Sequence, residues 1–178
     1  MGEATFYLKA EFPDEEAAEK ALGVIKEILQ DVADCWEEWQ EIRDELDKSV
    51  KERHERLMSN HPLAARFLRL PEPDESDEFM NYLAGYLEIT HDFELFRKGN
   101  VLFLYDTVWH LGSWDNIAEL FAKFGAKRVG WISDEWIDLA SMIFSVIRMK
   151  PSRVDGGEVE KNFEEALMMI LYKETCAR

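Results

Sequence analysis

Polar and apolar residues alternate in two regions of the chain, and this period of two predicts β-strands. In residues 5–12 every second side chain is apolar, and the same alternation runs through residues 87–96. A turn-like segment at residues 97–100 follows, and residues 101–109 again favour a strand, so this region predicts a β-hairpin. A fourth strand is predicted over residues 127–133.

A helical period begins after the first strand and runs unusually far. Apolar residues recur at steps of three, four or seven from Ala18 to Leu57, and no proline interrupts residues 14–61. The pattern predicts either one very long helix or two nearly continuous ones. A single helix over residues 14–57 would be roughly 65 Å long, so its second half must pack against a helical hairpin partner or another subunit. Shorter helices are predicted over residues 63–70, 75–83, 114–124, 135–149 and 158–173.

The predicted order of elements is β-α-β-β-α-β. It resembles the ferredoxin-like arrangement, in which a four-stranded antiparallel sheet carries two helices on one face. The resemblance rests on two connecting helices and on the strands Thr5–Phe12, Leu87–Leu95, Val101–Trp109 and Lys127–Ser133. We therefore predict a single α+β domain over residues 1–178, with a helical insertion at about 36–83 and a C-terminal helical extension at about 135–175. Because this fold carries many functions, the resemblance predicts no activity.

The formal net charge is −16, and the acidity is concentrated in the first half of the chain. Residues 1–80 carry 22 acidic and 10 basic residues, whereas residues 81–178 carry 15 and 11. A surface of this sign repels nucleic-acid phosphates and anionic membranes, so neither partner is expected. It suits a basic protein partner or bound cations, or it simply keeps the protein soluble.

No segment is apolar over enough residues to cross a bilayer, and the chain starts without the pattern of a signal peptide. Cys35 and Cys176 have no metal-binding spacing and are interpreted as reduced thiols, which predicts a cytoplasmic protein. The P-loop, dinucleotide-binding, zinc-protease and nucleophile-elbow motifs do not occur, so no cofactor is expected.

The hairpin contains the best catalytic candidates. With Lys98 and Gly99 as a two-residue turn, His91 faces Asp106 across the strands, and His110 lies further along the same face. A carboxylate beside an imidazole favours its charged form, and such a pair can act as a general base. No serine, cysteine or further acid can be placed beside the pair, so a structural, hydrogen-bonded histidine is favoured over a catalytic one.

The other face of the hairpin is rich in aromatic and apolar side chains. They are Phe96, Val101, Phe103, Tyr105 and Trp109. Nucleotide bases stack on aromatics of this kind, but no basic residue lies among them and the neighbouring strand is acidic. An apolar surface of this size is seldom left in water. We therefore expect the C-terminal helices or a second subunit to cover it, and we predict a homodimer.

Five carboxylates in the long helical segment share one face at a spacing of three and four residues, with Trp36 and Trp39 beside them. They are Asp31, Asp34, Glu38, Glu41 and Glu45. Such a stripe can be a solvated face, a docking face for a basic protein or a site for a hard cation. Glu38 and Glu41 resemble half of the metal motif of helical nucleotide pyrophosphatases, but the chain offers no convincing second half, so no metal is expected.

These patterns favour a non-enzymatic acidic interaction protein, for example an inhibitor or neutraliser of a basic protein. The alternative is a small-molecule or metal-dependent enzyme that uses His91, Asp106 and His110 or the acidic stripe. Convergence of these three residues in an open pocket would favour the enzyme. A closed sheet with a large acidic face would favour the interaction protein.

Overall fold

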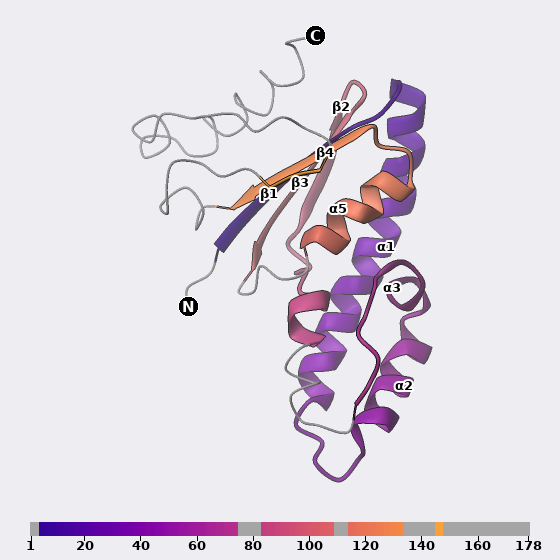
Figure 1. Cartoon of the computed structure of the whole chain (residues 1–178), viewed down its shortest axis with the longest axis vertical. Helices are drawn as coiled ribbons and strands as arrows, with labels where there is room; N and C mark the ends of the chain where they lie inside the picture. The colour runs from indigo at the N-terminus through magenta and orange to yellow at the C-terminus, as the bar shows by residue number, and fades with distance from the viewer. Residues whose placement is uncertain (1–3, 75–82, 109–113, 134–144, 148–178) are drawn as a thin grey trace.

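The computed structural model describes residues 4–74, 83–108, 114–133 and 145–147 (Figure 1). They form an α+β fold in which a long helix, α1 (Glu15–Ile42), packs on one face of an antiparallel sheet. The strand order is β2-β3-β1-β4-β5. The strands are β1 (Ala4–Glu11), β2 (Glu94–Lys98), β3 (Val101–Val108), β4 (Arg128–Ser133) and β5 (Ser145–Ile147). The other helices are α2 (Val50–Asn60), α3 (Pro62–Phe67) and α5 (Trp114–Lys123), and residues 83–87 are also helical.

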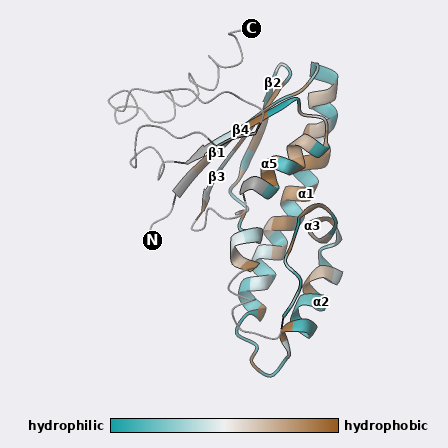
Figure 2. Ribbon diagram, in the orientation of Figure 1, coloured by the Kyte–Doolittle hydropathy of each residue, from teal (hydrophilic) through white to brown (hydrophobic). Residues whose placement is uncertain are grey.

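α1 begins where the sequence predicts a helix. The Asp14 side chain accepts a hydrogen bond from the backbone N–H of Ala17, and two acids occupy the first turn, where the helix dipole favours negative charge. Both apolar and polar residues occur along the helix (Figure 2), and a stripe of apolar residues from Ala18 to Ile42 is buried. With 28 residues α1 is about 42 Å long. It therefore extends well beyond the sheet (Figure 1).

The long helical period divides into two helices. α1 ends at Ile42, and residues 43–49 form the turn that leads to α2. Ser49 and Glu52 form a capping box, in which the Ser49 hydroxyl accepts from the Glu52 N–H and the Glu52 carboxylate accepts from the Ser49 N–H. This Ser-x-x-Glu pattern is visible in the sequence and marks the start of a second helix.

α2 and α3 return along the part of α1 that extends beyond the sheet (Figure 1). The buried Arg53 of α2 donates to the backbone carbonyl of Arg43, just after the end of α1. Val50, Leu57 and Ala64 join the same hydrophobic core as α1. The sequence predicted that the second half of the long helix packs against either a helical hairpin partner or another subunit. The structure confirms the hairpin partner, which is formed by α2 and α3 of the same chain.

β1 lies at the centre of the sheet and pairs antiparallel with β3 and β4. Its predicted inward face is confirmed, because Phe6, Leu8 and Ala10 are buried in the core together with Leu102 and Leu104 of β3. The opposite face of the sheet carries other buried side chains, namely Tyr7, Lys9, Val101 and Phe103. None of the helices in the described ranges is long and apolar enough to cross a membrane.

The hairpin turn lies one residue further along the chain than predicted. Gly99 and Asn100 form the turn, and Lys98 pairs with Val101. Gly99 has a φ of 58°, a conformation that glycine adopts most readily, so its place in the chain fixes the turn. The predicted turn at Lys98 and Gly99 was therefore wrong, and the strand register shifts by two residues.

Two further predicted elements need correction. β2 begins only at Glu94. The reason is that the backbone N–H and the hydroxyl of Thr90 donate hydrogen bonds to the Asp106 carboxylate, so at Thr90 a side chain takes the place of the backbone of a neighbouring strand. In the predicted helix 135–149, residues 145–147 instead form β5, which pairs antiparallel with β4. The rest of that helix, the predicted helix 158–173 and most of the predicted segment 75–83 lie outside the described residues.

Candidate functional site

Four of the five predicted carboxylates lie on one side of α1, whereas Glu45 lies in the turn that follows, because α1 ends at Ile42 and not beyond Glu45 as predicted. The structure divides the five into two rows. Residues seven apart lie almost directly above one another on a helix, and this spacing relates Asp31 to Glu38 and Asp34 to Glu41. The inner row contacts α2 and α3 and contains Asp31, Glu38 and Glu45. The outer row lies on the side of His91 or faces solvent, and we define it as Asp34, Glu41 and the neighbouring Glu37.

Asp31 holds the N-terminus of α3. Its Oδ2 accepts hydrogen bonds from the backbone N–H groups of Leu63 (3.0 Å) and Ala64 (2.8 Å), and its Oδ1 lies 3.2 Å from Nδ1 of His61. N–H groups in the first turn of a helix have no partner within that helix, and negative charge is favourable there. Asp31 is therefore a helix cap supplied by a different helix.

Glu38 binds the junction between α2 and α3. Its Oε1 accepts from Nε of Arg56 (3.2 Å) and Nδ2 of Asn60 (3.0 Å), and its Oε2 lies 2.8 Å from Nε2 of His61. Both ring nitrogens of the buried His61 thus lie within hydrogen-bond distance of a carboxylate. Arg56 also pairs with Glu45 at 3.2 Å. The inner row therefore joins the returning helices to α1.

The outer row faces solvent, and His91 is the one histidine among the described residues that it contacts. Nε2 of His91 lies 3.3 Å from Oδ1 of Asp34 and 3.3 Å from Oε2 of Glu37, and its Nδ1 lies 2.7 Å from Nε2 of Gln30. The Asp34 and Glu37 side chains are 50% and 64% exposed. Glu41 is exposed and makes no hydrogen bond or ion pair with any described residue. Exposed pairs of this kind contribute little to stability, so the outer row is not needed to hold the fold.

Two open concavities lie beside the outer row and meet at Lys26 and Gln30. The larger has a volume of about 610 Å³ and is lined by Gly23, Lys26, Glu27, Gln30, Asp31, Asp34 and Leu63. The smaller, of about 360 Å³, is lined by Lys26, Gln30, His91 and residues 93–96. Three carboxylates border the larger concavity against one lysine. Asp31 is bound to α3, so Glu27 and Asp34 are the carboxylates that face a positively charged side chain placed there.

The two tryptophans beside the stripe are stacked, with ring centroids 4.9 Å apart. Trp39 is only 2% exposed, and the Arg43 guanidinium lies over its ring. Trp36 is half-buried and packs against the core. The pair thus contributes mainly to the packing of α1, and Trp36 is the member with surface left to offer a partner.

His91 and Asp106 do not form the predicted pair. His91 lies in a turn before β2 and contacts α1, whereas Asp106 lies on β3 opposite Phe6 of β1. The prediction failed because the turn at Gly99 changes the register and because His91 is not part of the strand. His110 lies outside the described residues.

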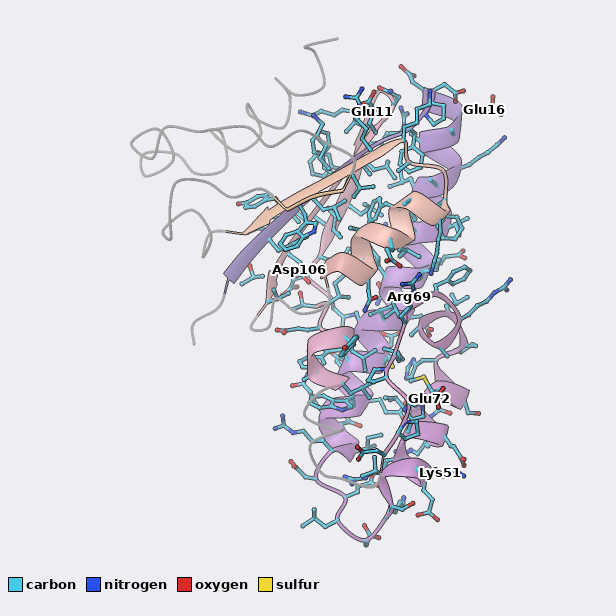
Figure 3. All side chains as sticks on the ribbon, in the orientation of Figure 1. Glu11, Glu16, Lys51, Arg69, Glu72 and Asp106 are labelled. Carbon is cyan, nitrogen blue, oxygen red and sulfur yellow. The ribbon has the colours of Figure 1, made fainter. Side chains whose placement is uncertain are left out.

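Asp106, labelled in Figure 3, is instead a buried carboxylate that accepts three hydrogen bonds from described residues. Thr90 donates from its backbone N–H (2.8 Å) and its hydroxyl (2.6 Å), and the Thr107 N–H donates at 2.8 Å. Burial raises the pKa of Asp106, the hydrogen bonds from Thr90 and Thr107 act against this, and the charge of Glu88 adds to it. Asp106 therefore anchors the segment before β2 to β3.

Cys35 is fully buried on α1 close to the inner row. Burial raises the pKa of its thiol well above the ordinary value, and the charges of Asp31 and Glu38 act in the same direction. A neutral, buried thiol is a poor nucleophile. Among the residues that the structure describes, no group of three or more His, Cys, Asp and Glu side chains is arranged to hold a metal ion.

Comparison with known proteins gives no relative: no family model matches the chain, and neither a curated protein nor a solved structure is detectably similar to it.

The sequence did not point to the partners of the inner row, which are His61, Arg56 and Asn60. They lie 11 to 30 positions from the carboxylates that they contact. No motif connects residues so far apart, and only the return of α2 along α1 brings them together. The Ser49–Glu52 capping box was the one signal that could have predicted this return.

Proposed function

We propose that this chain is a non-enzymatic interaction protein that binds a basic partner protein through the outer row on α1, acting as an inhibitor or neutraliser of that partner. The observation that carries the proposal is the exposure of Asp34, Glu37 and Glu41 while the inner row is used within the chain. The acidic concavity beside the row adds a place for a lysine or arginine side chain.

Electrostatic arguments support a partner at this place. Like charges at helical spacing repel one another by a few tenths of a kcal/mol per pair, so a basic surface laid on the row would relieve this repulsion. Glu27 and Glu41 make no ion pair within the described residues and remain available to such a surface. Complementary charge of this kind acts mainly on the rate of encounter.

The experiment compares the wild type with two triple variants of equal charge. The test variant is D34N/E37Q/E41Q. The control is E16Q/E55Q/E72Q, which neutralises exposed acids elsewhere on the surface; Glu16 and Glu72 are labelled in Figure 3. Proteins captured from a lysate are identified by mass spectrometry, and association rates with each captured protein are measured at low and high salt.

We expect a basic protein that is captured by the wild type and the control but lost with the test variant, with an association rate that falls steeply with salt. Equal capture by all three proteins would refute the assignment to the outer row. A thermal-shift screen with Mg²⁺, Mn²⁺, Ca²⁺ and Zn²⁺ gives an independent check. A rise in melting temperature that the test variant abolishes would overturn the proposal in favour of a metal-dependent function.

We further propose that β1, α1, β2, β3, α5 and β4 form a ferredoxin-like core within a single domain, and that α2 and α3 belong to a helical insertion. The strand order β2-β3-β1-β4 and the all-antiparallel pairing support this proposal. An experimental structure of the full chain tests it.

A further inference from the structure

β2 lies at the edge of the sheet, because among the described strands it pairs with β3 alone. Its five residues are Glu94, Leu95, Phe96, Arg97 and Lys98. An open concavity lined by residues 93–96 together with Lys26 and Gln30 of α1 lies beside the first half of the strand, and the Glu94 and Lys98 side chains are exposed. An exposed strand edge offers unpaired backbone groups to another strand.

The hairpin geometry determines which backbone groups point outward. Lys98 and Val101 flank a two-residue turn, and the residues that flank such a turn exchange hydrogen bonds. Hydrogen-bonded and non-hydrogen-bonded pairs alternate along an antiparallel ladder. It follows that Leu95 and Arg97 direct their backbone N–H and C=O groups away from β3, toward the open edge.

A second copy of β2 matches these groups in one antiparallel register. When Phe96 faces Phe96 of the other copy, Leu95 of each copy faces Arg97 of the other, so the outward backbone groups form two hydrogen-bonded pairs. The same register places Glu94 opposite Lys98 twice. If the two-fold axis moves from Phe96 to Arg97, the Arg97 residues of the two copies face each other. If it moves to Leu95, Lys98 lies beyond the paired segment.

We infer that β2 is a dimerisation edge, on which two copies of this chain pair antiparallel across a two-fold axis centred at Phe96. A two-fold interface requires a surface that is complementary to itself, and the alternating Glu94 and Lys98 provide this. The strand has one acid and two bases, and Arg97 is already paired with Glu19 of α1, so the charges that meet across the two-fold axis are those of Glu94 and Lys98. This inference is independent of the outer row on α1.

Phe96 adds an apolar contribution to the same interface. Its ring stacks on Phe103 of β3, with centroids 5.2 Å apart and an angle of 18° between the rings. Phe96 is half-buried, whereas Phe103 is 3% exposed. Pairing in the inferred register would continue this aromatic row into the second copy and bury the remaining surface of Phe96.

Charge reversal at Glu94 and Lys98 tests both the interface and its register. The single variants E94K and K98E each place like charges opposite one another at both ends of the paired strands. The double variant E94K/K98E restores opposite charges with the same composition. Both side chains are exposed, so all three variants are expected to fold, which circular dichroism and thermal melting verify.

Sedimentation equilibrium at micromolar concentration is the measurement. We expect a wild-type dimer, a dissociation constant raised roughly tenfold or more in each single variant, and recovery of the dimer in the double variant. A monomeric wild type would overturn the inference and assign the charges of β2 the role of protecting an edge from pairing. A dimer unaffected by the single variants, or a folded double variant that stays as weak as they are, would also overturn it.

Discussion

Replacing Asp31 by alanine tests the division of the acidic stripe into an inner and an outer row. The change removes the acceptor for the N–H groups of Leu63 and Ala64 and one of the two carboxylates that bind His61. An N-cap contributes about 0.5–2 kcal/mol, and a hydrogen bond to a charged group about 1.5–3 kcal/mol. These contributions are not additive, and the Asp31 side chain is 18% exposed. We therefore expect D31A to lower the free energy of unfolding by about 2–4 kcal/mol.

D34A is the matched control, because it removes the same charge one turn further along α1. The Asp34 side chain is 50% exposed and its ion pair with His91 spans 3.3 Å, so its loss should cost about 0–1 kcal/mol. Urea unfolding followed by circular dichroism measures both variants, with unchanged m-values as the sign of two-state behaviour. Hydrogen exchange at the amides of Leu63 and Ala64 should accelerate in D31A and not in D34A. Equal destabilisation by the two variants would refute the division into rows.

Three further predictions concern buried or constrained groups. In a C176S background, Cys35 should not react with Ellman's reagent in the native protein and should react fully in urea; rapid native labelling would contradict its burial. G99A should destabilise the protein by about 1 kcal/mol and G99N by less, as measured by urea unfolding, because a Cβ at Gly99 meets only Glu15 Oε1 at 3.9 Å and the cost is purely conformational. The folded-state pKa of Asp106 is raised, so its contribution to stability is present at low pH and lost as the pH rises through that pKa. The stability advantage of the wild type over D106N should therefore be larger at about pH 4 than at about pH 7, and a constant advantage would contradict the direction of the shift.

Local patterns in the sequence were sufficient for most of the regular elements. The alternation in residues 5–12 gave β1 and its inward face, and the 3.6-residue period gave α1 with its buried stripe. These predictions hold because side-chain periodicity and end-capping act over a few residues. The acidic side of α1 was visible for the same reason, since residues three and four apart share a helix face.

The failures occurred where a distant residue decided the outcome. Thr90 lies in an alternating segment, but Asp106 takes its N–H and hydroxyl, and the strand begins four residues later at Glu94. His91 consequently turns toward Asp34 and Glu37 on α1 instead of Asp106. A one-residue error in the place of the turn was enough to change every cross-strand pair.

The sequence by itself determined the acidity, the amphipathic α1 and the α+β class, because charge and periodicity are properties of neighbouring residues. Only the tertiary structure decided which of the five carboxylates, spaced three and four residues apart, are used within the chain. Asp31, Glu38 and Glu45 meet cations or helix N–H groups because α2 and α3 fold back along α1, whereas Asp34 and Glu41 lie beyond that contact. Spacing on a helix fixes the direction of a side chain, but its partner depends on which segment packs against that direction.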